Sequence, residues 1–328
     1  MRESQHTRSV ILLSGGGGGA RLAAAMHNRQ SNAALAIVTN TGDDFEHLGL
    51  TICPDTDSVM YAVTQQLDRD RGWGRAGETW NALSEIMQMG GPDWFQLGDR
   101  DLALHLQRAA MLVEGRSMAD VTAVLAGRLG LSGATRIIPA TEQAIRTHVI
   151  TDEGEMAFQE YFVARRCEPR LVNIRYQGVD AASPNQALTK LINQADPGAV
   201  DVVFGPSNPF LSLAPILDIP GMTSLLRERA RRVVAVSPIV GGQAIKGPAA
   251  KIMSELGMPV SAEGWMHWFD QRYPGLVDIW VWDEQDRGAL SISPTPQPPV
   301  LLTNTLMAEP LVARAFAEWL MKECLGVD

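Results

Sequence analysis

Five acidic side chains stand close together in "NTGDDFEHLGLTICPDTDSVMY", residues 40–61. They are Asp43, Asp44, Glu46, Asp55 and Asp57. Carboxylates at this density repel one another unless a cation or buried donors compensate their charge. A hard cation such as Mg²⁺ bridges carboxylate and phosphate oxygens, so we expect Asp55 or Asp57 to contact a metal ion or a ligand. A simpler interpretation is that these residues form turns and that Asp57 or Ser58 caps the helix that follows.

A run of five glycines lies in "ILLSGGGGGARLAAAM", residues 11–26, between an apolar segment and a predicted helix. It consists of Gly15, Gly16, Gly17, Gly18 and Gly19. Glycine loses the most conformational entropy on folding, so such a run indicates a need for bare backbone. A glycine-rich loop between a strand and a helix directs N–H groups toward an anion, and we predict phosphate binding here. A tight structural turn is the alternative.

Two known sequence patterns restrict which class of ligand the glycine run could bind. Ala20-Arg21-Leu22 stands where a Walker A loop requires Gly-Lys-Ser/Thr, which argues against a P-loop NTPase. Gly15, Gly17 and Ala20 fit the dinucleotide pattern G-x-G-x-x-G/A, but no acidic residue ends the second predicted strand.

Three further stretches carry polar groups beside predicted strands or helix starts. "GPSNP", residues 205–209, follows a buried strand and is predicted to bind a ligand. "SPIVGGQAIKGPAAK", residues 237–251, repeats this pattern one strand later and contains Lys246, a possible phosphate partner. "WFQLGDRDLALHLQR", residues 94–108, is dense in charge at a helix start, where Asp99 could cap the helix and Arg100 could pair with it.

Composition excludes several classes of function. A net charge of −9 argues against a nucleic-acid-binding surface. Three widely spaced cysteines give neither a disulfide framework nor a zinc site, and the histidines form no catalytic triad. No apolar stretch is long enough for a signal peptide or a membrane span, so we expect a cytoplasmic protein. Loops that bind phosphate, without an obvious nucleophile, are typical of a transferase that relies on positioning and a metal ion.

Apolar runs separated by helical patterns must position these groups. The predicted strands are "SVILLS", "AALAIVTN", "TRIIPA", "AVDVVFGPSN", "ARRVVAVSPIVGG" and "GLVDIWVWDE". Their uninterrupted apolar character is typical of strands that are covered on both faces. Residues 58–132 show helical spacing instead, and residues 152–154 are predicted to turn a β-hairpin. We therefore predict one α/β domain over residues 1–328: a Rossmann-like, mostly parallel sheet with helices on both faces and a helical insertion at 58–132.

The motifs resemble those of the 2-phospho-L-lactate transferase family. They are "SGGGGGARL", "NTGDDFEHLGLTICPDTDSVMY", "RGWG…ETW", "WFQLGDRDLALHLQR", "FQEYF", "GPSNPFLSLAPILDIPGM" and "VVAVSPIVGGQAIKGPAAK". They occur in order from residue 14 to residue 251, and the combination of "TGDD…PDTD" with "GPSNP…SPIVGG" is highly specific.

The resemblance implies an enzyme of coenzyme F-420 biosynthesis. Such an enzyme transfers a phospholactyl-type group from a guanosine-diphosphate-activated donor to the ribitol hydroxyl of the deazaflavin Fo. GMP is released, Mg²⁺ is required, and the family suggests a homodimer. No motif indicates whether the three-carbon acid derives from 2-phospholactate, phosphoenolpyruvate or 3-phosphoglycerate.

The resemblance also implies roles for particular residues. Nucleotide contacts fall on Gly15, Gly16, Gly17, Gly18, Gly19, Gly205, Pro206, Ser207, Asn208, Pro209, Ser237 and Lys246. Metal contacts fall on Asp43, Asp44, Asp55 and Asp57, and Fo contacts fall on Asp57, Gln96, Asp99 and Arg100. Asp55 and Asp57 are the expected catalytic residues. The sequence departs from the family at Gly17 and Gly19, where Thr is frequent, and at Leu104, where Thr is common.

The expected mechanism is direct displacement at phosphorus. The Fo hydroxyl attacks the phosphate distal to guanosine, and Asp57 or another carboxylate of the cluster orients or deprotonates that hydroxyl. Two alternatives stay open. One is a non-catalytic regulatory protein of the same fold that binds a sugar nucleotide, and the other is a nicotinamide-dependent oxidoreductase.

Overall fold

A seven-stranded sheet forms the centre of the computed structural model, which describes residues 8–29, 33–245, 247–290 and 298–327. The strand order is β14-β13-β10-β9-β1-β2-β5, and all neighbours pair in parallel. The strands are β1 (Ser9–Ser14), β2 (Ala34–Thr39), β5 (Thr135–Pro139), β9 (Val200–Phe204), β10 (Ala230–Val236), β13 (Ile279–Asp283) and β14 (Val300–Thr303). The predicted Rossmann-like parallel sheet is confirmed.

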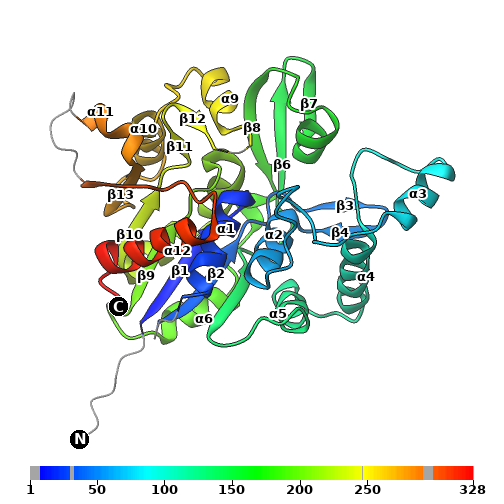
Figure 1. Cartoon of the computed structure of the whole chain (residues 1–328), viewed down its shortest axis with the longest axis horizontal. Helices are drawn as coiled ribbons and strands as arrows, with labels where there is room; N and C mark the ends of the chain where they lie inside the picture. Colours follow the sequence, from blue (N-terminus) through cyan, green and yellow to red (C-terminus); the bar gives the residue numbers. More distant parts are fainter. Residues whose placement is uncertain (1–7, 30–32, 246, 291–297, 328) are drawn as a thin grey trace, which may run out of the picture.

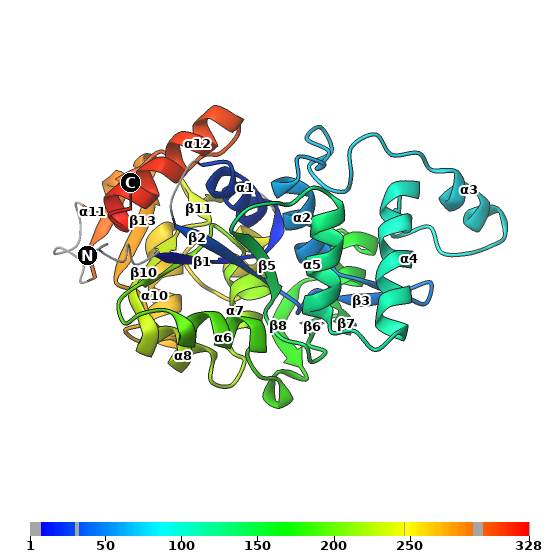
Figure 2. The same cartoon turned by 90° about the horizontal axis from the view of Figure 1, so that it is seen from below.

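Helices cover both faces of this sheet (Figures 1 and 2). One face carries α1 (Gly16–His27), α2 (Pro54–Val63), α4 (Asp99–Val113), α5 (Met118–Arg128) and α12 (Pro310–Trp319). The other carries α6 (Gln186–Gln194), α7 (Ala214–Leu217), α8 (Met222–Arg229), α9 (Ala249–Glu255) and α10 (Ala262–Arg272). Side chains of β1 alternate between the two cores, with Val10 and Leu12 in one and Ile11 and Leu13 in the other. This burial on both faces explains why its sequence is uninterruptedly apolar.

Residues 58–132, predicted as a helical insertion, contain most of α2 and all of α3 to α5, with α3 (Asn81–Gln88) lying far from the sheet in Figure 1. The first helix, α2, begins at Pro54 and has Cys53 as its N-cap residue. The interpretation of Asp57 or Ser58 as a cap is therefore wrong. Pro54 suits the first helical position, because its φ angle already matches a helix and its missing N–H group is not needed there. The helix therefore begins before Asp55 and Asp57, which lie within its first turn.

Smaller elements surround the sheet. The hairpin predicted around residues 152–154 joins β6 (Arg146–Thr151) to β7 (Gly154–Ala157), and β8 (Leu171–Gln177), which was not predicted, completes a three-stranded antiparallel sheet. Two other hairpins pair β3 (Phe45–His47) with β4 (Leu50–Ile52) and β11 (Ile239–Val240) with β12 (Gln243–Ala244). The remaining elements are α11 (Arg287–Leu290), η1 (Glu160–Ala164), η2 (Val179–Ala181), η3 (Pro209–Leu213), η4 (Glu284–Asp286) and η5 (Leu320–Cys324).

Among the described residues, no single helix is long and apolar enough to cross a membrane. Pro209–Leu217 and Met222–Arg229 meet the length and composition criteria only as a pair, and a bend of 79° separates them.

The glycine run is not a loop, since four of its residues belong to the first turns of α1. Only Gly15 lies outside the helix, in an extended conformation. A side chain at Gly18 would overlap the carbonyl oxygen of Pro206, and a Cβ at Gly15 would lie 2.5 Å from a carboxylate oxygen of Asp55. The absence of side chains at Gly15 and Gly18 therefore lets α1 pack closely against the loop after β9 and the start of α2.

We expect Gly18→Ala to lower the free energy of unfolding by ~1–3 kcal/mol, because backbone must move to admit the new methyl group. Gly127→Ala in α5 is the matched control. Its Cβ would meet no atom within 4 Å, so it should raise that free energy by ~0.5–1 kcal/mol through helix propensity. Urea denaturation measures both effects. Equal stability of the two variants would contradict the proposed packing.

Candidate functional site

The candidate site residues lie where the strand order reverses beside β1. From β1 the chain proceeds outward through β2 and β5, and later on the other side through β9, β10, β13 and β14. Ligands of open α/β sheets bind beyond the carboxyl ends of the strands at such a point. The loops that follow β1, β2 and β9 meet there, because Asn40 N donates to Ser14 O at 3.1 Å and Gly15 N donates to Ser207 Oγ at 3.1 Å. The structure thus brings the glycine run and the "GPSNP" loop together.

Asp55 fastens the start of α2 to the start of α1. Its carboxylate accepts hydrogen bonds from Gly16 N at 2.6 Å and from Asn40 Nδ2 at 2.9 Å. The Asn40 side chain also donates to Leu211 O at 3.0 Å and accepts from Gly42 N at 2.8 Å. Burial raises the pKa of Asp55, although the hydrogen bonds from Asn40 and Gly16 lower it. One N–H group at the α1 N-terminus is therefore bound to a carboxylate of the protein itself.

Asp43 and Asp44 are buried with little compensation. Within the described part of the chain, Oδ1 of each has no hydrogen-bond partner. Burial, and then the neighbouring Asp55, raise the pKa of Asp43 well above its usual range. Burial also raises the pKa of Asp44 to about 8, against the attraction of Arg146. Without a cation, burial thus favours the protonated form of both carboxyl groups.

These carboxyl groups suit a divalent cation that a ligand helps to hold. No group of three or more His, Cys, Asp or Glu side chains in the described ranges is arranged to bind a metal ion. Mg²⁺ commonly uses only one or two carboxylates and completes its coordination with phosphate oxygens and water. The neighbouring pair Asp43 and Asp55, with a free oxygen on Asp43, meets that requirement.

Asp57 differs from the other three aspartates because a buried arginine compensates it. Arg108 of α4, 1% exposed, donates from Nη1 to Asp57 Oδ2 at 3.1 Å and from Nη2 to Asp57 Oδ1. Nη1 also lies 2.9 Å from His105 Nδ1, which must accept because a guanidinium only donates. Burial lowers the pKa of His105 to about 4, so this imidazole is neutral. Because a guanidinium already neutralises its charge, Asp57 is less suited to a metal than Asp43 or Asp55, whose hydrogen-bond donors are neutral.

Of the other predicted acceptor contacts, Gln96 lies in the connection between α3 and α4, and Asp99 and Arg100 are the first residues of α4. Gln96 and Arg100 are exposed. Asp99 accepts from Thr79 Oγ1 and from the N–H groups of residues 81 and 82, and these hydrogen bonds lower its pKa to about 2. Arg100 Nη1 donates to Ala76 O at 3.1 Å. In this structure, the contacts of Asp99 and Arg100 tie the two helices together.

A cavity of about 560 Å³ opens beside Asp43 and Asp44. Its wall contains aromatic rings from separate segments, with Phe45 and Trp94 at 5.9 Å between ring centroids. The lining residues are Gly42, Asp43, Asp44, Phe45, Glu46, Trp94, Arg146, Thr147, His148, Ala157, Phe158, Gln159, Glu160 and Ala164. Sequence reasoning did not identify Arg146, Thr147 or Phe158. The "FQEYF" motif, which supplies Phe158, was the available signal.

The remaining nucleotide-binding candidates have different surroundings. Asn208 caps η3 by accepting from Phe210 N at 3.0 Å and Leu211 N at 3.1 Å, whereas its buried Nδ2 has no partner among the described residues. Ser237 follows β10, and its Oγ donates to Ile239 O at 2.9 Å within its own turn. Lys246 lies outside the described residues. Asn208 is thus the candidate with a buried donor still free for a ligand.

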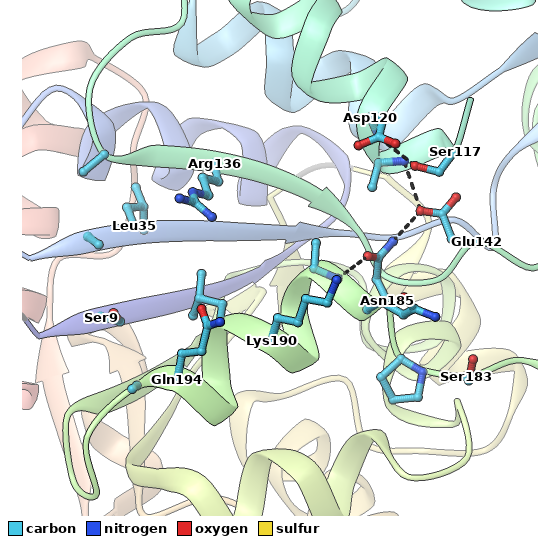
Figure 3. Close-up of a pocket in the computed structure, with 18 of the residues that line it drawn as sticks. Ser9, Leu35, Ser117, Asp120, Arg136, Glu142, Ser183, Asn185, Lys190 and Gln194 are labelled. Atoms are coloured by element: carbon cyan, nitrogen blue, oxygen red, sulfur yellow. Dashed lines mark hydrogen bonds between the residues drawn. The ribbon is translucent and has the colours of Figure 1, made fainter. Parts of the chain in front are cut away.

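A second cavity, of about 1040 Å³, runs along β5, the outer strand of the sheet (Figure 3). It contains none of the predicted site residues. Glu142 on its wall accepts from the N–H groups of Met118 and Ala119 and from Asn185 Nδ2. These contacts hold the starts of α5 and α6, which is a structural role.

Comparison with known proteins identifies the family. The sequence model of the family described as 2-phospho-L-lactate transferase CofD matches residues 10–293. The chain belongs to this family. The predicted resemblance is confirmed, and the chain is a transferase of the CofD family.

Curated members of the CofD family carry two names. The chain is 38% identical over 262 residues to a phosphoenolpyruvate transferase of Kitasatospora aureofaciens, covering 78% of this chain and 79% of the relative. It is 37% identical to a phosphoenolpyruvate transferase of Mycolicibacterium smegmatis, with 84% of each covered. It is 34% identical to a 2-phospho-L-lactate transferase of Methanosarcina mazei, covering 77% of this chain and 80% of the relative.

A solved structure supports the fold of this CofD family member. The crystal structure of a UPF0052 family protein from Bacillus halodurans superposes with a TM-score of 0.61 and covers 96% of this chain and 99% of that one. At 14% identity this likeness shows the fold alone.

The pairing of Asp57 with Arg108 predicts the outcome of a double-mutant cycle. Asp57→Asn should lower the free energy of unfolding by ~3–5 kcal/mol, because it leaves a buried guanidinium without its partner. Arg108→Met should be destabilising as well. The double variant should be more stable than the sum of the single effects predicts, by more than ~1 kcal/mol. Additive effects in urea denaturation would show that the pair is not coupled.

The raised pKa of Asp44 predicts how stability depends on pH in EDTA. Between its ordinary value of 3.8 and about 8, the folded state binds a proton that the unfolded state has released. The free energy of unfolding should therefore fall between pH 7 and 8, by ~1 kcal/mol or less. Asp44→Asn should reduce this slope, whereas Asp93→Asn, at an exposed position, should retain it. The same slope in all three proteins would contradict the assignment.

Proposed function

We propose that this CofD family protein transfers a phospholactyl-type group from a guanosine-diphosphate-activated donor to the ribitol hydroxyl of the deazaflavin Fo. The reaction releases GMP and belongs to coenzyme F-420 biosynthesis. The names of the relatives support transfer of a phosphorylated three-carbon acid. The observation that carries the proposal is the group of buried, incompletely compensated carboxyls beside the α1 N-terminus and an aromatic cavity.

The donor's diphosphate would lie across the carboxyl ends of β1 and β9. A Cβ on Gly16 would meet no atom within 4 Å, so there is open space above this residue. Two buried polar atoms lack partners in the described ranges: Ser14 Oγ at the end of β1, and Asn208 Nδ2 in the loop after β9. Hydrogen-bond donors at a helix N-terminus are well suited to phosphate oxygens.

Mg²⁺ would be held by Asp43 and Asp55, with Asp44 nearby. When bound, it would neutralise the diphosphate and stabilise charge on the leaving oxygens. Arg108 fixes the Asp57 carboxylate through both oxygens, which suits Asp57 to orienting the attacking hydroxyl. Asp44 lines the cavity, and its Oδ1 has no hydrogen-bond partner among the described residues, so we assign proton removal to it.

The acceptor ring would occupy the cavity beside Asp43 and Asp44. Phe45, Trp94 and Phe158 offer aromatic faces to a planar heterocycle, and the volume of about 560 Å³ lies in the range of small-molecule sites. Trp94 belongs to the "WFQLGDRD" stretch that the family resemblance linked to Fo. Contacts from Gln96, Asp99 and Arg100, a homodimer and a cytoplasmic location stay predictions.

A product assay tests the function. The protein is incubated with Fo, Mg²⁺ and each of three donors, in which guanosine diphosphate is linked to lactate, enolpyruvate or glycerate. Mass spectrometry of the deazaflavin should show addition of one phospho-acid group, and chromatography should show an equal amount of GMP. Binding of nucleotide without turnover of any donor would favour the non-catalytic alternative and contradict the proposal.

Removal of the metal ion, or of one carboxylate that would bind it, should lower turnover more than donor affinity, because charge changes most in the transition state. We expect EDTA to abolish transfer and Mg²⁺ to restore it. Asp55→Asn should lower kcat on the order of a hundredfold, as for loss of a several-kcal/mol electrostatic contribution. Asp93→Asn controls for loss of charge. Wild-type kcat in a folded Asp55→Asn variant would exclude Asp55 from the metal site.

A further inference from the structure

Arg146 brings a positive charge into the cavity beside the acidic residues. It is the first residue of β6, and among the residues that line this cavity it is the sole Lys or Arg. Its Nη1 donates to Ile145 O at 2.9 Å, whereas Nη2 reaches only 3.9 Å from Glu46 Oε1. The Glu46 side chain is 57% exposed and also accepts from Thr51 Oγ1. Such a long, exposed ion pair is weak, so Arg146 can exchange Glu46 for a ligand.

The neighbouring residue supplies a second unused group. Thr147 lines the same cavity, is 3% exposed, and its Oγ1 has no hydrogen-bond partner in the described part of the chain. The backbone fixes its position, since Thr147 N donates to Gly42 O at 2.7 Å in the turn that carries Asp43 and Asp44. A buried hydroxyl without a partner costs free energy, which a bound polar ligand would recover.

The other charges of the cavity explain why an anion would select Arg146. Asp43, Asp44, Glu46 and Glu160 line it, so an anionic group is repelled from most of the wall. His148 is engaged with Glu155, at 3.0 Å from its Nδ1. Arg108, the other arginine beside the acidic residues, donates to both oxygens of Asp57. Arg146 is therefore the available cation on this wall.

We propose that Arg146, assisted by Thr147 Oγ1, binds the carboxylate of the three-carbon acid during transfer. This inference rests on the proposed function. Lactate, enolpyruvate and glycerate all keep a free carboxylate when they are linked through phosphate, and a planar guanidinium matches a carboxylate with two parallel hydrogen bonds. Arg146 thus orients the donor so that its distal phosphate faces the acceptor, and it selects an acid over a neutral alkyl group.

The test compares two donors with and without the arginine. One donor is guanosine diphosphate linked to lactate, and the other carries an isopropyl group, in which a methyl replaces the carboxylate. Wild type should prefer the lactate donor in kcat/KM by about 30-fold or more, as for a charged hydrogen-bonded pair. Arg146→Gln should lower kcat/KM for the lactate donor by that factor and leave kcat/KM for the isopropyl donor almost unchanged. Arg146→Lys should keep part of the preference.

Controls separate this role from a structural one. Arg175→Gln removes an exposed arginine of the same small sheet, paired with Glu155, and should leave the preference for lactate unchanged. GDP affinity, measured by calorimetry, and the thermal midpoint should be the same in Arg146→Gln and wild type. If Arg146→Gln lowered kcat/KM equally for both donors, or for neither, the proposed role of Arg146 would be overturned. If wild type transferred nothing from any guanosine-diphosphate-linked donor, the proposed function itself would fail.

Discussion

The hydrogen bond between the Asp55 carboxylate and Gly16 N is the contact on which the arrangement of the site depends. It joins the first turn of α2 to the first turn of α1, and Asn40 joins both to the turn after β2. Without it, three loops that leave different strands would have no common polar anchor. The bond also places a carboxylate where a phosphate would otherwise find an N–H group, which makes the site acidic before any ligand is present.

Within the described residues, the buried aspartates of this region are of two kinds: Asp57 is paired with an arginine, whereas Asp43 and Asp44 are not. Arg108 compensates Asp57 with a guanidinium from α4, so that pair is self-sufficient. Asp43 and Asp44 have no such partner in the part of the chain that the structure describes, and burial raises their pKa values. The first arrangement is rigid whether or not ligands are present. In the second, the ionisation of Asp43 and Asp44 depends on whether a cation binds nearby, which would suit the proposed binding of a diphosphate and a metal ion.

Much of the fold could be predicted because each central strand is buried on both faces and is followed by turn residues. β14 was missed, since its half-buried "VLLT" is short and follows a proline-rich stretch. The acidic and glycine-rich stretches could be recognised because their residues are adjacent in sequence. The Asp57–Arg108 pair could not, because 51 residues separate the partners and only the folded arrangement of α2 and α4 brings them together. The same reason hides Arg146, at the start of β6, and Phe158, directly after β7, which reach the cavity from a distant part of the sequence.

The glycine-rich start of α1 also limits how this enzyme can diversify. A helix start without side chains offers no group that substitution could adapt to a new ligand, and its close neighbours exclude even a methyl group at Gly15 and Gly18. Variation in specificity must therefore arise on the facing segments, such as the turn after β2, the beginning of β6 and the loop after β9. Under the proposed function, one sterically restricted helix start opposite several adjustable segments would let the donor's nucleotide stay in place while the acid that it carries changes.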